Sequence, residues 1–130
     1  MSSVFSRIVA GEIPCYKIAE NEKFLAFLDV SPLVKGHTLV IPKEEIDYLF
    51  DMDDTLLSEM IVFSKKVANA IKISIPCIKV GVSVIGLEVP HAHIHLIPMN
   101  SVSEMNFSKS KLSLSSDEMI SIAAIIKAKL

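Results

Sequence analysis

Three of the four histidines in this chain occur at alternate positions of one short apolar segment. The segment, residues 90–98, has the sequence PHAHIHLIP and is bounded by proline at both ends. Successive side chains of an extended strand point to opposite faces, so His91, His93 and His95 are expected on one face and apolar side chains on the other. Because the unperturbed pKa of imidazole lies near neutrality, such a row can supply a nucleophile, an acid, a base or metal ligands at pH 7.

Two kinds of site use a row of imidazoles on one strand. Alternating strand histidines bind zinc through their ring nitrogens. Alternatively, one histidine attacks a substrate while its neighbours orient it. A single strand histidine is usually structural, but three on one face, from a chain with only four, are hard to obtain by chance. The segment by itself leaves the choice between metal site and nucleophile open.

The remaining hydrophobic periodicity predicts the elements that must position this strand. Helices are expected over 4–10, 53–72 and 116–128, and strands over 15–20, 23–29, 37–41, 77–85 and 90–98. Ser3 suits the start of the first helix, and Ser115 with Glu118 resembles a capping box at the start of the last. The pattern predicts an α+β fold: a five-stranded, mostly antiparallel sheet with the long helix packed on one face and an extra C-terminal helix.

Length, composition and charge limit the class of protein. The 130 residues suit a single domain over 1–130, and a hydrophobic content of 51% suggests that some apolar surface is buried between subunits. No stretch reaches the roughly 18 apolar residues of a membrane span, and no secretory signal is recognisable. The formal charge of −2, with both signs interspersed, argues against nucleic-acid binding. Cys15 and Cys77 are expected as reduced thiols in a cytoplasmic protein.

The spacing of the three histidines resembles the signature of the histidine triad (HIT) superfamily, in particular its Hint-like branch. Four earlier segments are similar to that branch in the same order: Phe5–Ile8, Gly11–Pro14, Ala26–Pro32 and Gly36–Pro42. The similarity runs from about Phe5 to Pro98, which leaves residues 99–130 as a C-terminal extension outside it. The resemblance implies a HIT-like fold, and a two-fold homodimer in which the long helix and the fourth strand meet their mates.

The resemblance also implies an activity and assigns the histidines their roles. Hint-like proteins act on the α-phosphate of purine nucleoside 5′-phosphate derivatives such as phosphoramidates, through a covalent nucleotidyl-histidine that releases the monophosphate. By this likeness His93 is the nucleophile, and a backbone carbonyl within the triad strand fixes its tautomer. His91 and His95 hold phosphate oxygens, and His37 supports the triad from an adjacent strand. No metal belongs to this site and no cofactor is required, so any zinc would be adventitious or structural.

The expected partner is a purine nucleotide or a nucleoside phosphoramidate, and the resemblance assigns it a pocket. Asp29 matches an aspartate that accepts hydrogen bonds from both ribose hydroxyls, a geometry that two carboxylate oxygens suit. An apolar slot for the purine, together with the loop before the triad, completes the expected nucleotide-binding residues: Val4, Phe5, Ile8, Phe27, Leu28, Gly86 and Glu88. Without the family, the apolar members of this set would be interpreted simply as core.

The chain departs from the family pattern just ahead of the triad. Where a Gly-Gln-Ser run is expected it has Gly86-Leu87-Glu88, and Val80 stands where an asparagine is expected. Two neutral polar contacts are therefore missing, and Glu88 either pairs with a cationic leaving group such as a lysyl amine or points into solvent. The departure motivates an alternative function, a purine nucleotide-binding protein with little or no catalysis. A tris-histidine metal protein is the third and least favoured hypothesis.

Overall fold

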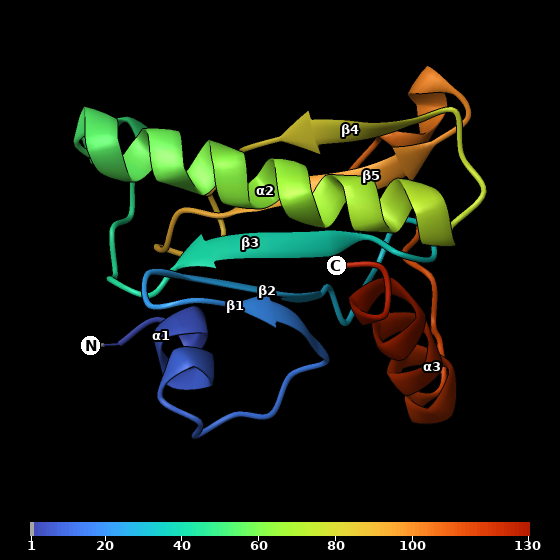
Figure 1. The fold of residues 1–130 in the computed structure, drawn as a ribbon, viewed down its shortest axis with the longest axis horizontal. Helices are drawn as coiled ribbons and strands as arrows, with labels where there is room; N and C mark the ends of the chain where they lie inside the picture. Colours follow the sequence, from blue (N-terminus) through green and yellow to red (C-terminus); the bar gives the residue numbers. More distant parts are fainter. Residues whose placement is uncertain (1) are drawn as a thin grey trace.

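The computed structural model describes residues 2–130 and has an α+β fold built on one five-stranded sheet (Figure 1). Met1, which the predicted domain includes, lies outside the described residues. The strand order is β1-β2-β3-β5-β4, and every neighbouring pair is antiparallel. The strands are β1 (Lys17–Glu20), β2 (Phe24–Leu28), β3 (Thr38–Pro42), β4 (Lys79–Ser83) and β5 (Ile94–Met99). The predicted fold class is confirmed.

The helices are α1 (Val4–Val9), α2 (Asp54–Ser74) and α3 (Ser116–Lys127), with 3-10 turns η1 (Leu49–Asp51) and η2 (Val102–Glu104). Each α-helix begins at a side chain that accepts a backbone N–H of its first turn: Ser3, Asp53 and Ser115. The chain leaves α1 through Gly11, whose φ of 81° is a left-handed conformation that glycine adopts without strain. Within residues 2–130, no helix has both the length and the apolar character needed to span a bilayer.

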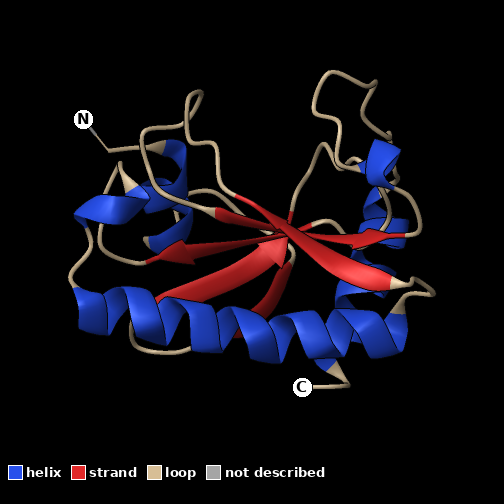
Figure 2. Ribbon diagram, turned by 90° about the horizontal axis from the view of Figure 1, so that it is seen from above, coloured by secondary structure: helices blue, strands red, loops and turns tan. Residues whose placement is uncertain are grey.

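The sheet separates two layers, as Figure 2 shows: α2 runs along one face, while α1 and long loops lie on the other. The strands supply both layers because their side chains alternate between faces. Phe24, Ala26 and Leu28 of β2 belong to the core under α2 and α3. Leu25 and Phe27 belong to a smaller cluster beneath α1. The second layer is therefore thinner, which leaves room for a cavity on that face.

The triad strand is shorter than its alternating pattern predicts. Pairing between β3 and β5 ends at Val40 and Ile94, so only His95 of the three triad histidines lies within a strand. The reason is a tight turn in which His91 N–H donates to the Val89 carbonyl at 2.8 Å, next to Pro90, which has no N–H to contribute to a ladder. The alternation of side chains nevertheless continues through the turn, since Ala92 packs in the α2-side core together with Ile94 and Leu96.

Candidate active site

A cavity of about 520 Å³ lies on the α1 side of the sheet, and three histidine rings line it: His37, His93 and His95. We call it the histidine pocket. Every residue that the sequence predicts for the site lines it, with the single exception of His91: Val4, Phe5, Ile8, Phe27, Leu28, Asp29, His37, Gly86, Glu88, His93 and His95. These residues come from α1, β2, β5, the connection between β2 and β3, and the loop ahead of β5, so the fold gathers distant segments at one place.

The apolar side of the histidine pocket is held together by aromatic contacts. The Phe5 ring meets the Phe27 ring edge-on, with centroids 5.7 Å apart, and meets the His93 ring in the same way at 5.0 Å. Such T-shaped contacts are favourable because the positive edge of one ring faces the negative face of another. Phe5 therefore links the apolar wall to the central histidine and restricts the rotation of that imidazole.

The tautomer of His93 follows from one short hydrogen bond. Its Nδ1 lies 2.7 Å from the carbonyl oxygen of His91. A carbonyl only accepts, so Nδ1 carries the proton and the lone pair of the neutral ring is on Nε2. Among residues 2–130, no hydrogen-bond partner faces Nε2, and this atom is not sealed from solvent. The neutral form of His93 thus presents the Nε2 lone pair to the cavity, and the His91 carbonyl holds the ring at Nδ1.

His37 and His95 form a directed chain of hydrogen bonds. The backbone N–H of Leu33 donates to His37 Nδ1 at 3.0 Å, so the proton of this neutral ring is on Nε2. His37 Nε2 donates in turn to His95 Nδ1 at 2.9 Å, which places the remaining proton of His95 on Nε2. The tautomers of His93 and His95 are thereby fixed, and they are opposite: His93 directs a lone pair into the pocket, whereas His95 directs an N–H into it.

Burial keeps both members of this chain neutral. It lowers the pKa of His37 to about 3 and that of His95 to about 4, with smaller contributions from neighbouring histidines. Asp29 Oδ2 lies 3.6 Å from His37 Nε2. Because the imidazole is uncharged at pH 7, this contact is not an ion pair. Asp29 Oδ1 accepts the Ser31 N–H at 2.9 Å, and burial raises the pKa of the Asp29 carboxyl.

The structure does not bring His91 into the cavity. The ring is fully buried (0% exposed), its Nε2 donates to the Pro42 carbonyl at 2.7 Å, and its Nδ1 accepts the Ser3 hydroxyl at 2.8 Å. With both nitrogens engaged, His91 has nothing left for a phosphate oxygen, so its placement does not support the role expected from the sequence. The His91 ring instead donates to the carbonyl of Pro42, the last residue of β3, beyond the point where the pairing of β3 with β5 ends. This hydrogen bond fixes the position of His91, whose own carbonyl orients the His93 ring.

The positions that depart from the family pattern have unequal consequences. Glu88 and Leu87 line the histidine pocket and are exposed, in the loop between β4 and β5. Val80 is half-buried in β4 opposite Pro98, and it is not among the residues that line the pocket. The substitution at Val80 therefore changes nothing at the cavity wall, whereas the carboxylate of Glu88 does contribute to it.

Among the lining residues that were not predicted from the sequence, two belong to the C-terminal extension. Phe107 and Lys111 come from the segment after η2, outside the resemblance. The Phe107 ring lies 4.8 Å from the His95 ring and 6.3 Å from the His37 ring, centroid to centroid. The only sequence signal was weak: Phe107 is the one aromatic residue after the triad, within a serine-rich stretch.

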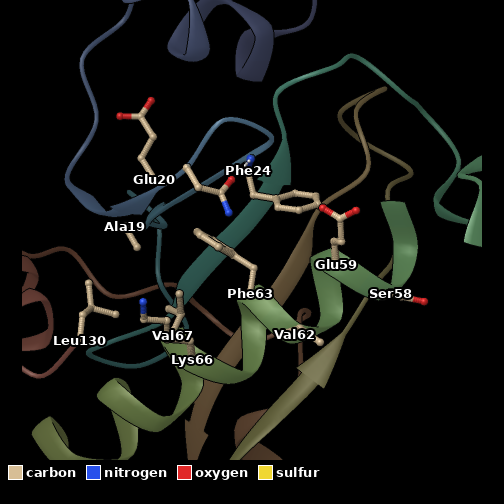
Figure 3. A pocket seen from close by; sticks show the side chains of 11 residues that line it. Ala19, Glu20, Phe24, Ser58, Glu59, Val62, Phe63, Lys66, Val67 and Leu130 are labelled. Atoms are coloured by element: carbon tan, nitrogen blue, oxygen red, sulfur yellow. Dashed lines mark hydrogen bonds between the residues drawn. The ribbon is translucent and has the colours of Figure 1, made fainter. Parts of the chain in front are cut away.

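A second and larger hollow, of about 620 Å³, lies where α2 passes the turn between β1 and β2 (Figure 3). We call it the α2 groove. Neither histidine nor cysteine is among the described residues that line it, and its carboxylates already have partners. Glu59 pairs with Lys23 at 2.9 Å, and Glu20 pairs with Lys43 at 2.8 Å. Size alone would favour this groove as the site, but it offers no imidazole or thiol and its carboxylates are already paired.

One group of side chains has the composition of a metal site: Asp29, His37 and His95, whose ligand atoms lie within 4.8 Å of one another. The three triad rings form no such group among residues 2–130. To bind zinc through Nε2, His37 would need its lone pair there and its proton on Nδ1, where it would oppose the Leu33 N–H. The hydrogen bonds in place therefore do not fit a zinc ion at this position.

Comparison with known proteins shows what this chain is similar to. A model of the HIT domain matches residues 10–102. The uncharacterized HIT-like protein of Borreliella burgdorferi is 39% identical over 119 residues, or 85% of this chain and 86% of that protein. The adenosine 5′-monophosphoramidase of Schizosaccharomyces pombe is 39% identical over 99 residues, or 75% and 74%. A zinc-bound histidine triad family protein from Mycobacterium smegmatis superposes with a TM-score of 0.83 at 28% identity, over 99% of this chain and 93% of that one. The chain therefore belongs to the HIT domain family.

Proposed function

We propose that this protein hydrolyses purine nucleoside 5′-phosphoramidates, or closely related nucleoside 5′-phosphate derivatives, and releases the nucleoside monophosphate. The observation that carries the proposal is the fixed tautomer of His93, whose Nδ1–H is bound to the His91 carbonyl and whose Nε2 lone pair faces the cavity. An unprotonated nitrogen is what nucleophilic attack requires. The similarity to a protein named adenosine 5′-monophosphoramidase supports the choice of a phosphoramidate.

In the first step, His93 Nε2 attacks the α-phosphorus and a bond forms between them. The bond from phosphorus to the amine nitrogen breaks, and its electron pair leaves with the amine, which takes a proton from solvent. The positive charge that develops on the imidazole is spread towards the His91 carbonyl through the Nδ1–H bond. Splitting the hydrolysis into two displacements replaces one difficult step by two easier ones.

In the second step, a water oxygen attacks the same phosphorus and the bond to His93 Nε2 breaks, returning the lone pair to the ring. The water loses a proton to solvent, and the nucleoside monophosphate leaves. His95 Nε2–H, oriented by the chain from Leu33 through His37, is the donor placed to bond a phosphate oxygen as negative charge builds there. Of the two outer triad histidines, only His95 is available for this role, since both ring nitrogens of His91 are engaged elsewhere.

Recognition of the nucleoside is assigned to the opposite walls of the same cavity. Asp29 Oδ2 is the carboxylate oxygen left for ribose hydroxyls, since Oδ1 already accepts the Ser31 N–H. Phe5 and Phe27 form the apolar wall against which a purine would stack, with Val4 and Ile8 of α1 beside them. A cavity of about 520 Å³ lies within the usual range for small-molecule sites.

The test is single-turnover hydrolysis of an adenosine 5′-phosphoramidate, quenched in acid-free denaturant and followed by mass spectrometry of the protein. The expected result is an adenylyl group on the peptide that contains His93, formed and lost at rates that match AMP release. Under the alternative function, a nucleotide-binding protein with little catalysis, AMP would bind without any such label. Turnover without the label would leave the hydrolase standing but overturn the covalent mechanism.

We also propose that the protein forms a two-fold homodimer through β4 and the outer face of α2. β4 is an edge strand of the sheet, and large apolar side chains are exposed on and around these two elements: Ile61, Val62, Ile73, Ile78 and Val82. Large apolar side chains exposed on an edge strand and a helix are a feature of protein interfaces. Sedimentation equilibrium at micromolar concentration is expected to give twice the chain mass, and a purely monomeric protein would contradict the proposal.

A further inference from the structure

The segment 106–112, which we call the strap, begins with a local turn and is held beside the histidine pocket by two contacts with the rest of the protein. Its first turn is closed by the Asn106 side chain and carbonyl, which accept the N–H groups of Ser108 and Lys109 at 2.9 and 3.1 Å. In its middle, Phe107 packs on His95. At its end, Leu112 N–H donates to the Pro32 carbonyl at 2.8 Å. The strap therefore forms a defined wall of the cavity.

The ammonium group of Lys111 is held in place by the strap itself. Nζ donates to the Phe107 carbonyl at 2.6 Å and to the Lys109 carbonyl at 3.2 Å, and it lies 5.9 Å from the centroid of the Phe107 ring. An ammonium group has three N–H donors. Two are directed to these carbonyls, so one remains for a ligand while the position of the charge stays fixed.

The charges around the histidine pocket make this lysine unusual. Lys111 is the one lysine or arginine among the described residues that line it, against two carboxylates, Asp29 and Glu88. The rings of His37 and His95 are neutral at pH 7 and so add no positive charge. A phosphate group entering this cavity would meet a net negative lining, and only Lys111 can offset it.

We propose that Lys111 binds a phosphate oxygen of the nucleotide, so that a residue outside the family's matching segment supplies the positive charge of the site. The inference rests on the proposed function and deepens it, because it names the group that recognises the anionic part of the substrate. Charge-assisted hydrogen bonds to phosphate are stronger than neutral ones, and an ammonium acts as a point charge that tolerates several phosphate orientations.

The test compares AMP with uncharged adenosine in calorimetric titrations of the wild-type protein and of Lys111→Met, whose side chain is similar in length but uncharged. We expect Lys111→Met to raise the Kd of AMP by about 5- to 20-fold. The effect is smaller than for a buried charge, because solvent screens the exposed lysine. The Kd of adenosine should change by less than about twofold. Lys111→Arg, which keeps the charge, should recover most of the AMP affinity.

The control is Lys109→Met, which removes a neighbouring strap lysine that does not line the pocket. It should leave both Kd values unchanged. Equal weakening of AMP and adenosine in Lys111→Met would show that the lysine only supports the strap, and would overturn the inference. An unchanged Kd for AMP, or an equal loss in Lys109→Met, would overturn it too. If the wild-type protein bound neither ligand, the proposed function itself would fail, which is a different result.

Discussion

The histidine pocket and the α2 groove lie on opposite faces of one sheet and have similar volumes, about 520 and 620 Å³. They differ in the state of their polar groups. The groove carries exposed carboxylates already paired with lysines. The pocket carries buried imidazoles whose protons are fixed by backbone groups, with one lone pair and one N–H left facing the space. An oriented polar atom without a partner identifies a candidate site better than volume does.

The two regions also differ in what their polar groups cost the fold. Exposed ion pairs such as Lys23–Glu59 contribute little to stability, because water and salt screen them. Burying polar rings is costly unless each is hydrogen-bonded, and both His37 and His91 are bonded at both nitrogens. The α1 side of the sheet thus carries buried imidazoles whose burial is offset by a specific set of hydrogen bonds, and this is where function is expected.

The largest effect should follow from removing the lone pair. His93→Ala is expected to reduce kcat for an adenosine phosphoramidate by at least about three orders of magnitude, because no other side chain presents a nitrogen at the same place. Lys66→Met, in the α2 groove, is the matched control and should leave kcat within about twofold. Circular dichroism should show that both variants fold. More than about a tenth of the wild-type rate in His93→Ala would exclude the covalent mechanism.

Acid should destabilise the histidine side of the sheet selectively. In the folded protein the pKa of His37 is about 3 and that of His95 about 4, both below the ordinary value of 6.5. At a pH between the folded and the ordinary pKa, each of these two histidines is protonated in the unfolded chain and neutral in the native state. The free energy of unfolding is therefore unaffected by these two histidines well above pH 6.5, and it decreases as the pH falls below that value. We expect a loss of roughly 4 kcal/mol between pH 7 and pH 5, measured by urea denaturation.

Two variants separate this effect from general acid lability. His37→Asn keeps an acceptor for the Leu33 N–H but removes one titrating ring, so it should flatten the dependence of stability on pH. Glu59→Gln removes a carboxylate of the α2 groove and should leave that dependence unchanged. Identical pH dependence in wild type and His37→Asn would mean that the buried imidazoles do not set the acid sensitivity.

Removal of the Asp29 carboxylate, in the histidine pocket, should weaken the binding of nucleotides that carry ribose hydroxyls. Asp29→Ala is expected to weaken AMP binding by about 1–3 kcal/mol, the cost of losing hydrogen bonds to a charged group. Asp29→Asn keeps an acceptor for the Ser31 N–H and therefore tests the charge without disturbing the turn. Binding of 2′,3′-dideoxy-AMP should change much less in both variants. Equal losses for AMP and the dideoxy analogue would identify Asp29 as a turn residue only.

The smallest effect is expected at Glu88, because its carboxylate is exposed on the rim of the histidine pocket. It should favour cationic over anionic leaving groups, so a lysine phosphoramidate of adenosine should be a better substrate than a diadenosine polyphosphate. Glu88→Gln should narrow the ratio of the two kcat/KM values by about two- to fivefold, mainly by improving the anionic substrate. A ratio that does not change would place Glu88 away from the leaving group.

Local periodicity predicted the sheet, the helices and the shared face of the triad histidines, whereas the other predicted residues of the pocket came from the resemblance to the HIT family. Ser3 and Ser115 were correctly expected to begin helices, since a side-chain oxygen there meets unbonded backbone N–H groups. Alternation correctly separated His93 and His95 from the core-facing Ile94. Whether these residues act in catalysis stays a prediction until the variants above are measured.

What could not be predicted depends on contacts between distant segments. Period-two alternation treats His91 as equivalent to His93, but a turn at Val89 and the nearby Pro42 carbonyl give the His91 ring a buried position. Lys111 is one of many surface lysines in the sequence, and only the path of the strap brings it to the pocket. Hydrogen bonds between distant segments produce no periodic pattern in the sequence, so they cannot be predicted from it.

The chain of hydrogen bonds from Leu33 through His37 to His95 determines whether protons can be transferred along it. A proton wire works only if each donor can be resupplied from the next, yet the first donor here is a backbone amide, which cannot release its proton. The chain is therefore a fixed dipole, with its positive end at His95 Nε2–H, and not a conduit. The chain cannot resupply a proton to the departing amine, so the mechanism proposed above, in which the amine takes its proton from solvent, requires water to reach the leaving group while the phosphorus is attacked.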